Sequence, residues 1–265
     1  TPKVLPDDLS QAAWLNAPAL RAVADALGGG EGATRLVGGA VRDSLLGQTV
    51  ADIDLATRLL PQEVIDRLQA AGLKAVPTGL AHGTVTAVSH GRGFEVTTLR
   101  RDVETDGRHA LVAYTDDWAE DAARRDFTIN AIYADAITGA LYDPVGGLAD
   151  LAARTVRFIG DASARIDEDH LRILRWFRFA ARFGDLSGDA ETLALLAQRA
   201  PLLRSLSRER VADELLRILR LPDPVAAVTA MRDTGVLAEV APEIDAGGVD
   251  RLRTLVDREA AAGIA

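Results

Sequence analysis

Residues 36–57 read LVGGAVRDSLLGQTVADIDLAT: an apolar run, two glycines, a helical stretch, and two aspartates separated by one residue. Apolar patterning predicts strands over 34–37 and 51–57 with a helix over 40–46 between them. In the second strand, Asp52 and Asp54 would share one face and Ile53 would take the other. Two neighbouring carboxylates repel each other unless a cation lies between them. The stretch therefore predicts an α/β fold that holds a metal ion.

Mg²⁺ suits this pair because it prefers oxygen ligands and binds through one or two carboxylates together with substrate phosphates. Gly38 and Gly39 let a phosphate chain approach the backbone at the start of the helix, and Arg42 lies one turn further on. The segment matches neither a Walker motif nor a dinucleotide-binding GxGxxG. Glu95, in a strand predicted over 94–99, would add a third carboxylate, about the number that a two-metal site needs. The alternatives are a plain strand-to-helix turn and a solvated strand glutamate.

The rest of the chain divides into an α/β part and a helical part. Before residue 161, we expect an amphipathic helix over 12–27, a helix over 61–71, strands over 85–88 and 94–99, and a mobile loop over 101–117. After it, helical patterns follow at 168–183, 189–199, 207–220, 223–234 and 249–262. This predicts a catalytic head over 1–150, a helical neck over 151–220 and the start of a helical body over 221–265. We expect that body to be truncated, because the last pattern has no stop signal.

Composition narrows the function classes. The chain has no Cys, which excludes disulfides, thiolate zinc sites and a cysteine nucleophile. No apolar run approaches the roughly 20 residues needed to cross a bilayer, so we expect a soluble cytoplasmic protein. The net charge is −9, but residues 154–220 carry +3, with Arg as their only basic residue type. A basic segment between acidic ends fits RNA binding. The alternative is a coding bias towards Arg.

Several further motifs follow the opening stretch in order: TGLAHGTVTAV (78–88), FEVTTLR (94–100), RRDFTINAIYAD (124–135), DPVGGLADL (143–151), RIDEDHLRILRWFRFAARFG (165–184) and SRERVADELLRIL (207–219). Together they resemble the class II tRNA nucleotidyltransferase and bacterial poly(A) polymerase family, within the polymerase-β-like superfamily. The resemblance implies an α+β fold, in which a head with a mixed five-stranded sheet and helices precedes an all-α neck and body. It also implies Mg²⁺ dependence, ATP and CTP as substrates, and the tRNA 3′ end as acceptor.

The resemblance also assigns roles to residues of the head. The carboxylates would be catalytic, and four further residues would contact the nucleotide. The catalytic set is Asp52 and Asp54, which would bind the metal, and Glu95; the nucleotide contacts are Gly39, Arg42, Arg125 and Asp126. On the residues alone, RRDFTIN indicates only a charged turn into a strand.

Residues 168–172 (EDHLR) correspond to the nucleotide-selecting EDxxR motif of the family. On a continuous helix, Asp169 and Arg172 would be neighbours on one face. Asp accepts hydrogen bonds and Arg donates them, so the pair complements the edges of both cytosine and adenine. Guanine and uracil present a carbonyl beside an N–H, which is the reverse order of donor and acceptor, and they would leave polar groups of the protein unpaired. Arg175 and Arg178 would add nucleotide contacts; the alternative is an exposed basic face paired with nearby acidic residues.

The hypothesis that joins these features is a CCA-adding enzyme, which would add two C and one A to tRNA and release pyrophosphate. Alternatives within the family are a poly(A) polymerase and an enzyme that adds only A or only C. A different class is a non-catalytic RNA-binding protein descended from the enzyme. The intact carboxylates argue against it, because a binding protein has no use for an unfavourable acidic cluster.

Overall fold

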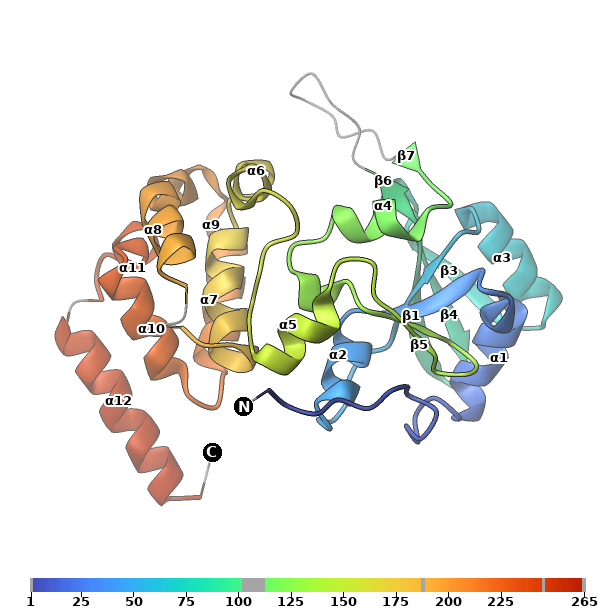
Figure 1. Ribbon diagram of the computed structural model, residues 1–265, viewed down its shortest axis with the longest axis horizontal. Coiled ribbons are helices and arrows are strands. Elements are labelled where there is room, and N and C mark those ends of the chain that lie inside the picture. Colours follow the sequence, from blue (N-terminus) through green and yellow to red (C-terminus); the bar gives the residue numbers. More distant parts are fainter. Residues whose placement is uncertain (1, 102–112, 187–188, 245, 264–265) are drawn as a thin grey trace. The chain divides into compact units, whose positions relative to one another are not determined.

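The computed structural model describes residues 2–101, 113–186, 189–244 and 246–263 (Figure 1). They divide into two compact units, one formed by Lys3–Ala152 and the other mainly by Ala153–Ala265. The sheet lies in the first unit, and the described part of the second is helical. The predicted α+β fold class is therefore confirmed. The further division of the helical part at residue 220 stays a prediction.

The described residues of the first unit form a mixed seven-stranded sheet in the order β3-β4-β5-β2-β1-β8-β9. Its strands are β1 (Thr34–Val37), β2 (Asp54–Thr57), β3 (Lys74–Gly79), β4 (Thr84–Ser89), β5 (Arg92–Thr98), β8 (Tyr133–Asp135) and β9 (Leu141–Tyr142). β2 and β5 are parallel, and the other neighbours are antiparallel. The expectation of five strands is wrong. β8 and β9 are only three and two residues long, too short for a periodic signal.

The two faces of this sheet differ in polarity. Leu36, Leu55 and Val96 are paired across β1, β2 and β5 and are buried on one face. Helix α1 (Pro18–Ala26) packs against β4, and helix α3 (Pro61–Ala70) packs against β3, β4 and β5 (Figure 1). Alternation sends Asp54 and Glu95 to the opposite face, where both are exposed. The helices thus bury the apolar face and leave the polar face to carry a site.

The first helix is shorter than the predicted span of 12–27. α1 begins at Pro18, and Ala17 before it is extended with φ −63° and ψ 131°. The residue before a proline is disfavoured in the helical region, whereas proline itself suits the first helical position. The remaining helices of this unit are α2 (Gly39–Leu45), α4 (Trp118–Ala123) and α5 (Gly147–Ala153).

The loop expected over 101–117 falls mostly on 102–112, which lies outside the described residues. Its two ends are paired: β6 (Arg100–Arg101) and β7 (Ala113–Tyr114) form an antiparallel ribbon. Asp117 then caps α4 by accepting a hydrogen bond from the Ala119 backbone at 2.7 Å. The ends of the predicted loop are therefore ordered structure.

The second unit contains α6 (Ala162–Glu168), α7 (Arg172–Phe183), α8 (Ala190–Arg199), α9 (Arg208–Leu219), α10 (Pro224–Asp233), α11 (Val236–Val240) and α12 (Ala246–Ala261). Asp161, Asp189, Ser207 and Asp223 cap four of these helices with their side chains. The helix predicted over 168–183 is wrong in its first residues, because α6 ends and α7 begins within it. In the described part of the chain, none of the helices combines the length and apolar character needed to span a membrane.

Candidate active site

Three carboxylates of the head lie around one cavity. Asp54 opens β2 and is in register with Glu95 on the parallel strand β5. Asp52 lies in the segment before β2, because the strand begins three residues later than predicted. Exposure still alternates there, with Asp52 and Asp54 exposed and Ile53 only 4% exposed. All three carboxylates line a cavity of about 540 Å³.

The electrostatics of this group are those of an unbalanced acidic cluster. The pKa of Asp54 is raised above its usual value, first by the partial desolvation of its carboxylate by the surrounding protein and then by the charges of Glu95 and Asp52, while Arg125 acts in the opposite direction. Each carboxylate therefore makes ionisation of Asp54 more costly. Among the described residues, no three acidic or histidine side chains converge closely enough to enclose a metal ion by themselves. The carboxylates border an open cavity, which leaves room for substrate oxygens in the coordination of an ion.

The glycine turn lies beside this cluster. Val37 at the end of β1 is in register with Asp54, so the chain passes directly from that position into Gly38. Gly38 has φ +72° and ψ −128° and precedes α2, a conformation that side chains other than glycine rarely adopt. A Cβ atom at Gly38 would meet nothing within 4 Å. The backbone here is open to a ligand and is shaped by the glycine.

Arg42 follows the glycine turn and is enclosed by protein. It is 6% exposed, and its Nη1 donates to Asn130 Oδ1 at 2.5 Å. Its Nη2 lies 2.7 Å from the Asp43 carboxylate. Asn130 in turn donates to Asp126 Oδ1 at 3.0 Å. Two residues predicted to contact the nucleotide, Arg42 and Asp126, are thus joined through Asn130, which the sequence analysis missed although it lies inside RRDFTIN.

Arg125 is held by a second buried carboxylate. Asp121 on α4 is 1% exposed and lies 3.0 Å from Arg125 Nη2 and 2.7 Å from Arg124 Nη2. Tyr133 donates its hydroxyl proton to Asp121 at 2.8 Å, and Arg125 Nε lies 3.2 Å from the Tyr133 oxygen. Burial opposes ionisation of Asp121, but the two arginines prevail and bring its pKa to about 2. Asp121 was also missed, because only the tertiary fold shows that it is buried.

In the helical unit, the structure corrects the geometry expected of Asp169 and Arg172. Asp169 has φ −150° and ψ 101° and lies between α6 and α7, so the two residues do not share one continuous helix. The Asp169 carboxylate accepts hydrogen bonds from Arg210 Nη2 at 2.9 and 3.0 Å. Arg172 Nη1 lies 2.7 Å from Glu168 and 2.8 Å from the Arg165 carbonyl oxygen. The acceptor and the donor are both present and are each fixed by a partner.

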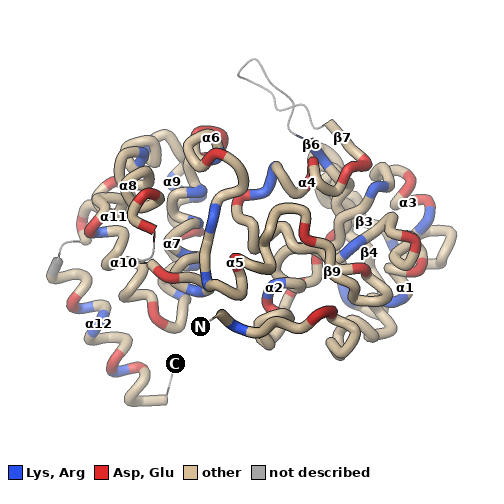
Figure 2. The backbone as a smooth tube through the Cα atoms, in the orientation of Figure 1, with Lys and Arg blue, Asp and Glu red and all other residues tan. Residues whose placement is uncertain are grey.

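Arg175 and Arg178 follow on α7, along which arginines recur (Figure 2). The Arg178 guanidinium lies 2.5 Å from Glu214 of α9, and the two side chains are only 14% and 3% exposed. Arg175 lies over the Phe179 ring, 5.3 Å from its centroid. Acidic residues lie among the arginines of this unit, so the positive charge of residues 154–220 is partly neutralised in ion pairs.

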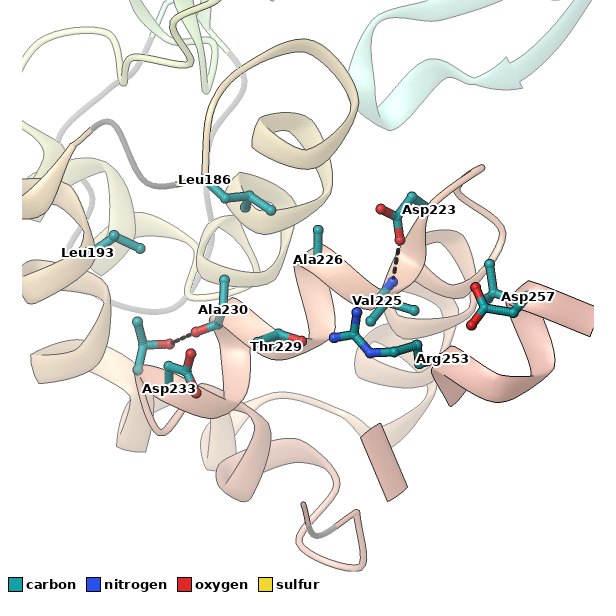
Figure 3. A pocket seen from close by; sticks show the side chains of 12 residues that line it. Leu186, Leu193, Asp223, Val225, Ala226, Thr229, Ala230, Asp233, Arg253 and Asp257 are labelled. Atoms are coloured by element: carbon teal, nitrogen blue, oxygen red, sulfur yellow. Dashed lines mark hydrogen bonds between the residues drawn. The ribbon is translucent and has the colours of Figure 1, made fainter. Parts of the chain in front are cut away.

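A second cavity, of about 720 Å³, lies among α8, α10 and α12 (Figure 3). Its wall is mainly apolar, with Asp223, Asp233, Asp257 and Arg253 as its charged residues. None of the predicted nucleotide contacts lines it. The cavity of the head, which gathers the predicted carboxylates, is the better candidate for chemistry.

Comparisons with known proteins identify both units. Residues 34–157 match the model of the poly A polymerase head domain, and residues 186–247 match that of the probable RNA and SrmB-binding site of polymerase A. The mitochondrial CCA tRNA nucleotidyltransferase 1 of Mus musculus is 49% identical over 188 residues, which cover 70% of this chain and 43% of that protein. The chain therefore spans less than half the length of this relative.

Solved structures agree. The CCA-adding enzyme of Bacillus stearothermophilus in complex with CTP is similar with a TM-score of 0.71 and 34% identity, over 84% of this chain and 54% of that one. A tRNA nucleotidyltransferase complexed with a primer tRNA and an incoming ATP analog has a TM-score of 0.64 and 30% identity, over 78% of this chain and 59% of that one. With the cavity of the head, the ordered motifs and these matches in agreement, the chain belongs to the family of class II CCA-adding enzymes and poly(A) polymerases.

Proposed function

We propose that the protein transfers CMP and AMP from CTP and ATP to the 3′ end of tRNA without a template and releases pyrophosphate. The observation that carries this proposal is the cavity lined by Asp52, Asp54 and Glu95. Its two strands bring carboxylates that are 41 residues apart in the chain into direct register. The named relatives, a CCA tRNA nucleotidyltransferase and a CCA-adding enzyme, support it.

The donor set of the cavity fits divalent cations, for which we propose Mg²⁺. Asp52 and Asp54 would hold the metal, with Glu95 as the third carboxylate of the site. The pKa of Asp54 is raised first by desolvation and then by the charges of Glu95 and Asp52, and a cation would relieve this repulsion. Ions bound there would activate the attacking 3′-hydroxyl and neutralise the leaving pyrophosphate. Carboxylates with open space beside them suit Mg²⁺, which usually retains water and substrate phosphates among its ligands.

The triphosphate would bind beside Asp54 on the side of β1. Gly38 and Gly39 supply backbone amides that a phosphate can approach closely. Arg42, fixed by Asn130, adds positive charge behind this turn. Arg125 and Asp126 would contact the phosphate or ribose of the nucleotide. Because Asp121 and Tyr133 already orient Arg125, little side-chain freedom would be lost when it binds.

Base selection would belong to Asp169 and Arg172 of the helical unit. A carboxylate acceptor and a guanidinium donor complement cytosine and adenine and mismatch guanine and uracil. Because α6 and α7 are separated at Asp169, the relative position of Asp169 and Arg172 is not set by the spacing of residues along one helix. Each group has a protein partner, so a base would share or replace the hydrogen bonds of Asp169 to Arg210 and of Arg172 to Glu168. Arg175 and Arg178 would add nucleotide contacts.

Incorporation of labelled nucleotides tests the proposal. The 265-residue chain is incubated with Mg²⁺ and tRNA that lacks its CCA end, and each nucleotide is supplied alone and then with the others. Addition limited to C, C and A is the expected result. Long A tails identify a poly(A) polymerase, and addition of only A or only C identifies a restricted enzyme. Binding of tRNA without any incorporation identifies an RNA-binding protein and contradicts the proposal. A cytoplasmic location stays a prediction.

A further inference from the structure

We propose that Arg92 binds a backbone phosphate at the 3′ end of the acceptor RNA and so marks the side from which the RNA enters. This inference rests on the proposed nucleotidyl transfer. It concerns a residue that lies in none of the motifs quoted above and that borders the carboxylate cavity.

Arg92 is the first residue of β5 and lines the same cavity as Asp52, Asp54 and Glu95. It is exposed, and its Nη2 donates to the Ala51 carbonyl oxygen at 3.2 Å. Strand alternation alone would place its side chain on the face of Phe94, and the guanidinium does lie 5.6 Å from that ring centroid. At the end of the strand, however, the bond to Ala51 draws it towards the segment that carries Asp52.

The order of the strands indicates which part of the reaction lies near Arg92. β2, which carries Asp54, runs between β1 and β5. The glycine turn that would hold the triphosphate follows β1, whereas Glu95 and Arg92 lie on β5, on the other flank of Asp54. In nucleotidyl transfer the attacking hydroxyl and the leaving pyrophosphate lie roughly in line on opposite sides of the phosphorus. With pyrophosphate towards β1, the acceptor RNA comes from the side of β5.

The negative charge of the cavity lining indicates a role for Arg92 in binding RNA. An RNA chain that approaches three carboxylates is repelled by them, and Arg92 is the single basic residue among the eight described residues that line the cavity. A guanidinium has five N–H donors and matches phosphate oxygens in a bidentate geometry. The bond to Ala51 uses one donor and leaves others for a phosphate. Arg92 can therefore bind the RNA backbone next to the reactive end without reading its sequence.

The test compares the Arg92→Gln and Arg92→Lys variants with Arg67→Gln as the matched control. Arg67 is an exposed arginine of α3, paired with Glu63 at 2.9 Å, and its replacement changes the net charge equally. The RNA is an acceptor-arm hairpin that ends before CCA. Its dissociation constant is measured by fluorescence anisotropy at several salt concentrations, and the KM values for hairpin and CTP are measured separately. Equal melting temperatures establish that the variants are folded.

For Arg92→Gln we expect hairpin affinity to fall about tenfold and KM for the hairpin to rise in parallel. The slope of log affinity against log salt should become shallower by about 0.7 to 0.9, the value for one phosphate contact. KM for CTP and kcat of Arg92→Gln should stay within about twofold of the wild-type values. The hairpin affinity of Arg92→Lys should lie between those of the wild type and Arg92→Gln, and Arg67→Gln should match the wild type.

Two results would overturn the inference. One is unchanged hairpin affinity and salt slope in Arg92→Gln. The other is a weaker response to Mg²⁺ or CTP with unchanged RNA binding, which would make Arg92 a counter-charge for the carboxylates. The binding measurement needs no turnover. A wild-type chain that binds the hairpin through Arg92 but incorporates nothing would therefore refute the proposed function and leave the RNA contact standing.

Discussion

Replacing Asp121 by Asn tests how the fold holds Arg125 in place. The Asp121 carboxylate is 1% exposed and accepts hydrogen bonds from Arg124, Arg125 and the Tyr133 hydroxyl. The backbone N–H of Arg100 donates to it as well, at 3.1 Å. An Asn keeps the shape but removes the negative charge and turns an N–H group towards these donors. We therefore expect the head to lose stability and Arg125 to lose its fixed orientation.

The pKa of Asp121 gives the magnitude. Burial alone would raise this pKa, but the nearby arginines bring it from 3.8 to about 2. A fall of this size corresponds to about 2–3 kcal/mol of stability from the charged form. For a unit of this length, roughly 2–4 °C are lost per kcal/mol, so Asp121→Asn should melt about 4–12 °C lower.

The pH dependence follows from the sign of this shift. Because the folded pKa lies below the unfolded one, the stabilisation is complete above about pH 4 and disappears as the pH falls towards 2. Urea unfolding of wild type and variant at pH 7, 5 and 3 measures the difference. It should be equal at the two higher values and smaller at pH 3.

Asp66→Asn is the control, because Asp66 is an exposed carboxylate of α3 that accepts a hydrogen bond from Gln62. It should change the free energy of unfolding by less than about 0.5 kcal/mol. The reasoning about Asp121 is wrong if its variant lies within that range of the wild type at pH 7, or if the difference persists unchanged at pH 3.

Three further changes test the site. Asp52→Asn should lower CMP incorporation by about 10²–10³-fold while the anisotropy of bound RNA is unchanged; a matching loss of RNA affinity would make Asp52 a structural residue. Gly38→Ala should lower the free energy of unfolding in urea by about 1–3 kcal/mol, because Gly38 has a φ of +72°. Gly32→Ala should lower it less, because Gly32 lies in the left-handed helical region; equal losses in the two variants would contradict this account. Asp169→Ala should allow GMP and UMP to be incorporated. Arg210→Gln, which removes only the ion-pair partner of Asp169, should not; unchanged nucleotide selectivity in Asp169→Ala would show that Asp169 does not select the base.

The sequence located much of the candidate site because the signals there are local. Alternation in a strand depends on neighbouring residues, so the exposure of Asp52 and Asp54 around buried Ile53 follows from the pattern alone. The same holds for Glu95 between Phe94 and Val96. The start of the first helix was predicted wrongly, because apolar periodicity suggested a helix over 12–27, whereas the helix begins at Pro18, where proline favours the first turn.

The break between α6 and α7 at Asp169 is a feature that local sequence patterns did not predict. Helical periodicity continues across residues 168–172, yet Asp169 accepts a hydrogen bond from the Leu171 backbone at 3.2 Å, which competes with the helix. Arg210, 41 residues away, binds the same carboxylate, and Ser205 lies 3.0 Å from His170. These long-range contacts favour the break over the helix.

By itself, the sequence predicted most of the strands and helices, the exposure of Asp52, Asp54 and Glu95, and the glycine turn before α2, because each depends on residues within one element or turn. Only the tertiary structure decided that Asp54 faces Glu95, that Asn130 joins Arg42 to Asp126, and that Arg92 borders the cavity. Each of these depends on the pairing of segments far apart in the chain. Such pairing depends on which apolar faces can be buried together, and it cannot be predicted from the pattern of residues within one segment.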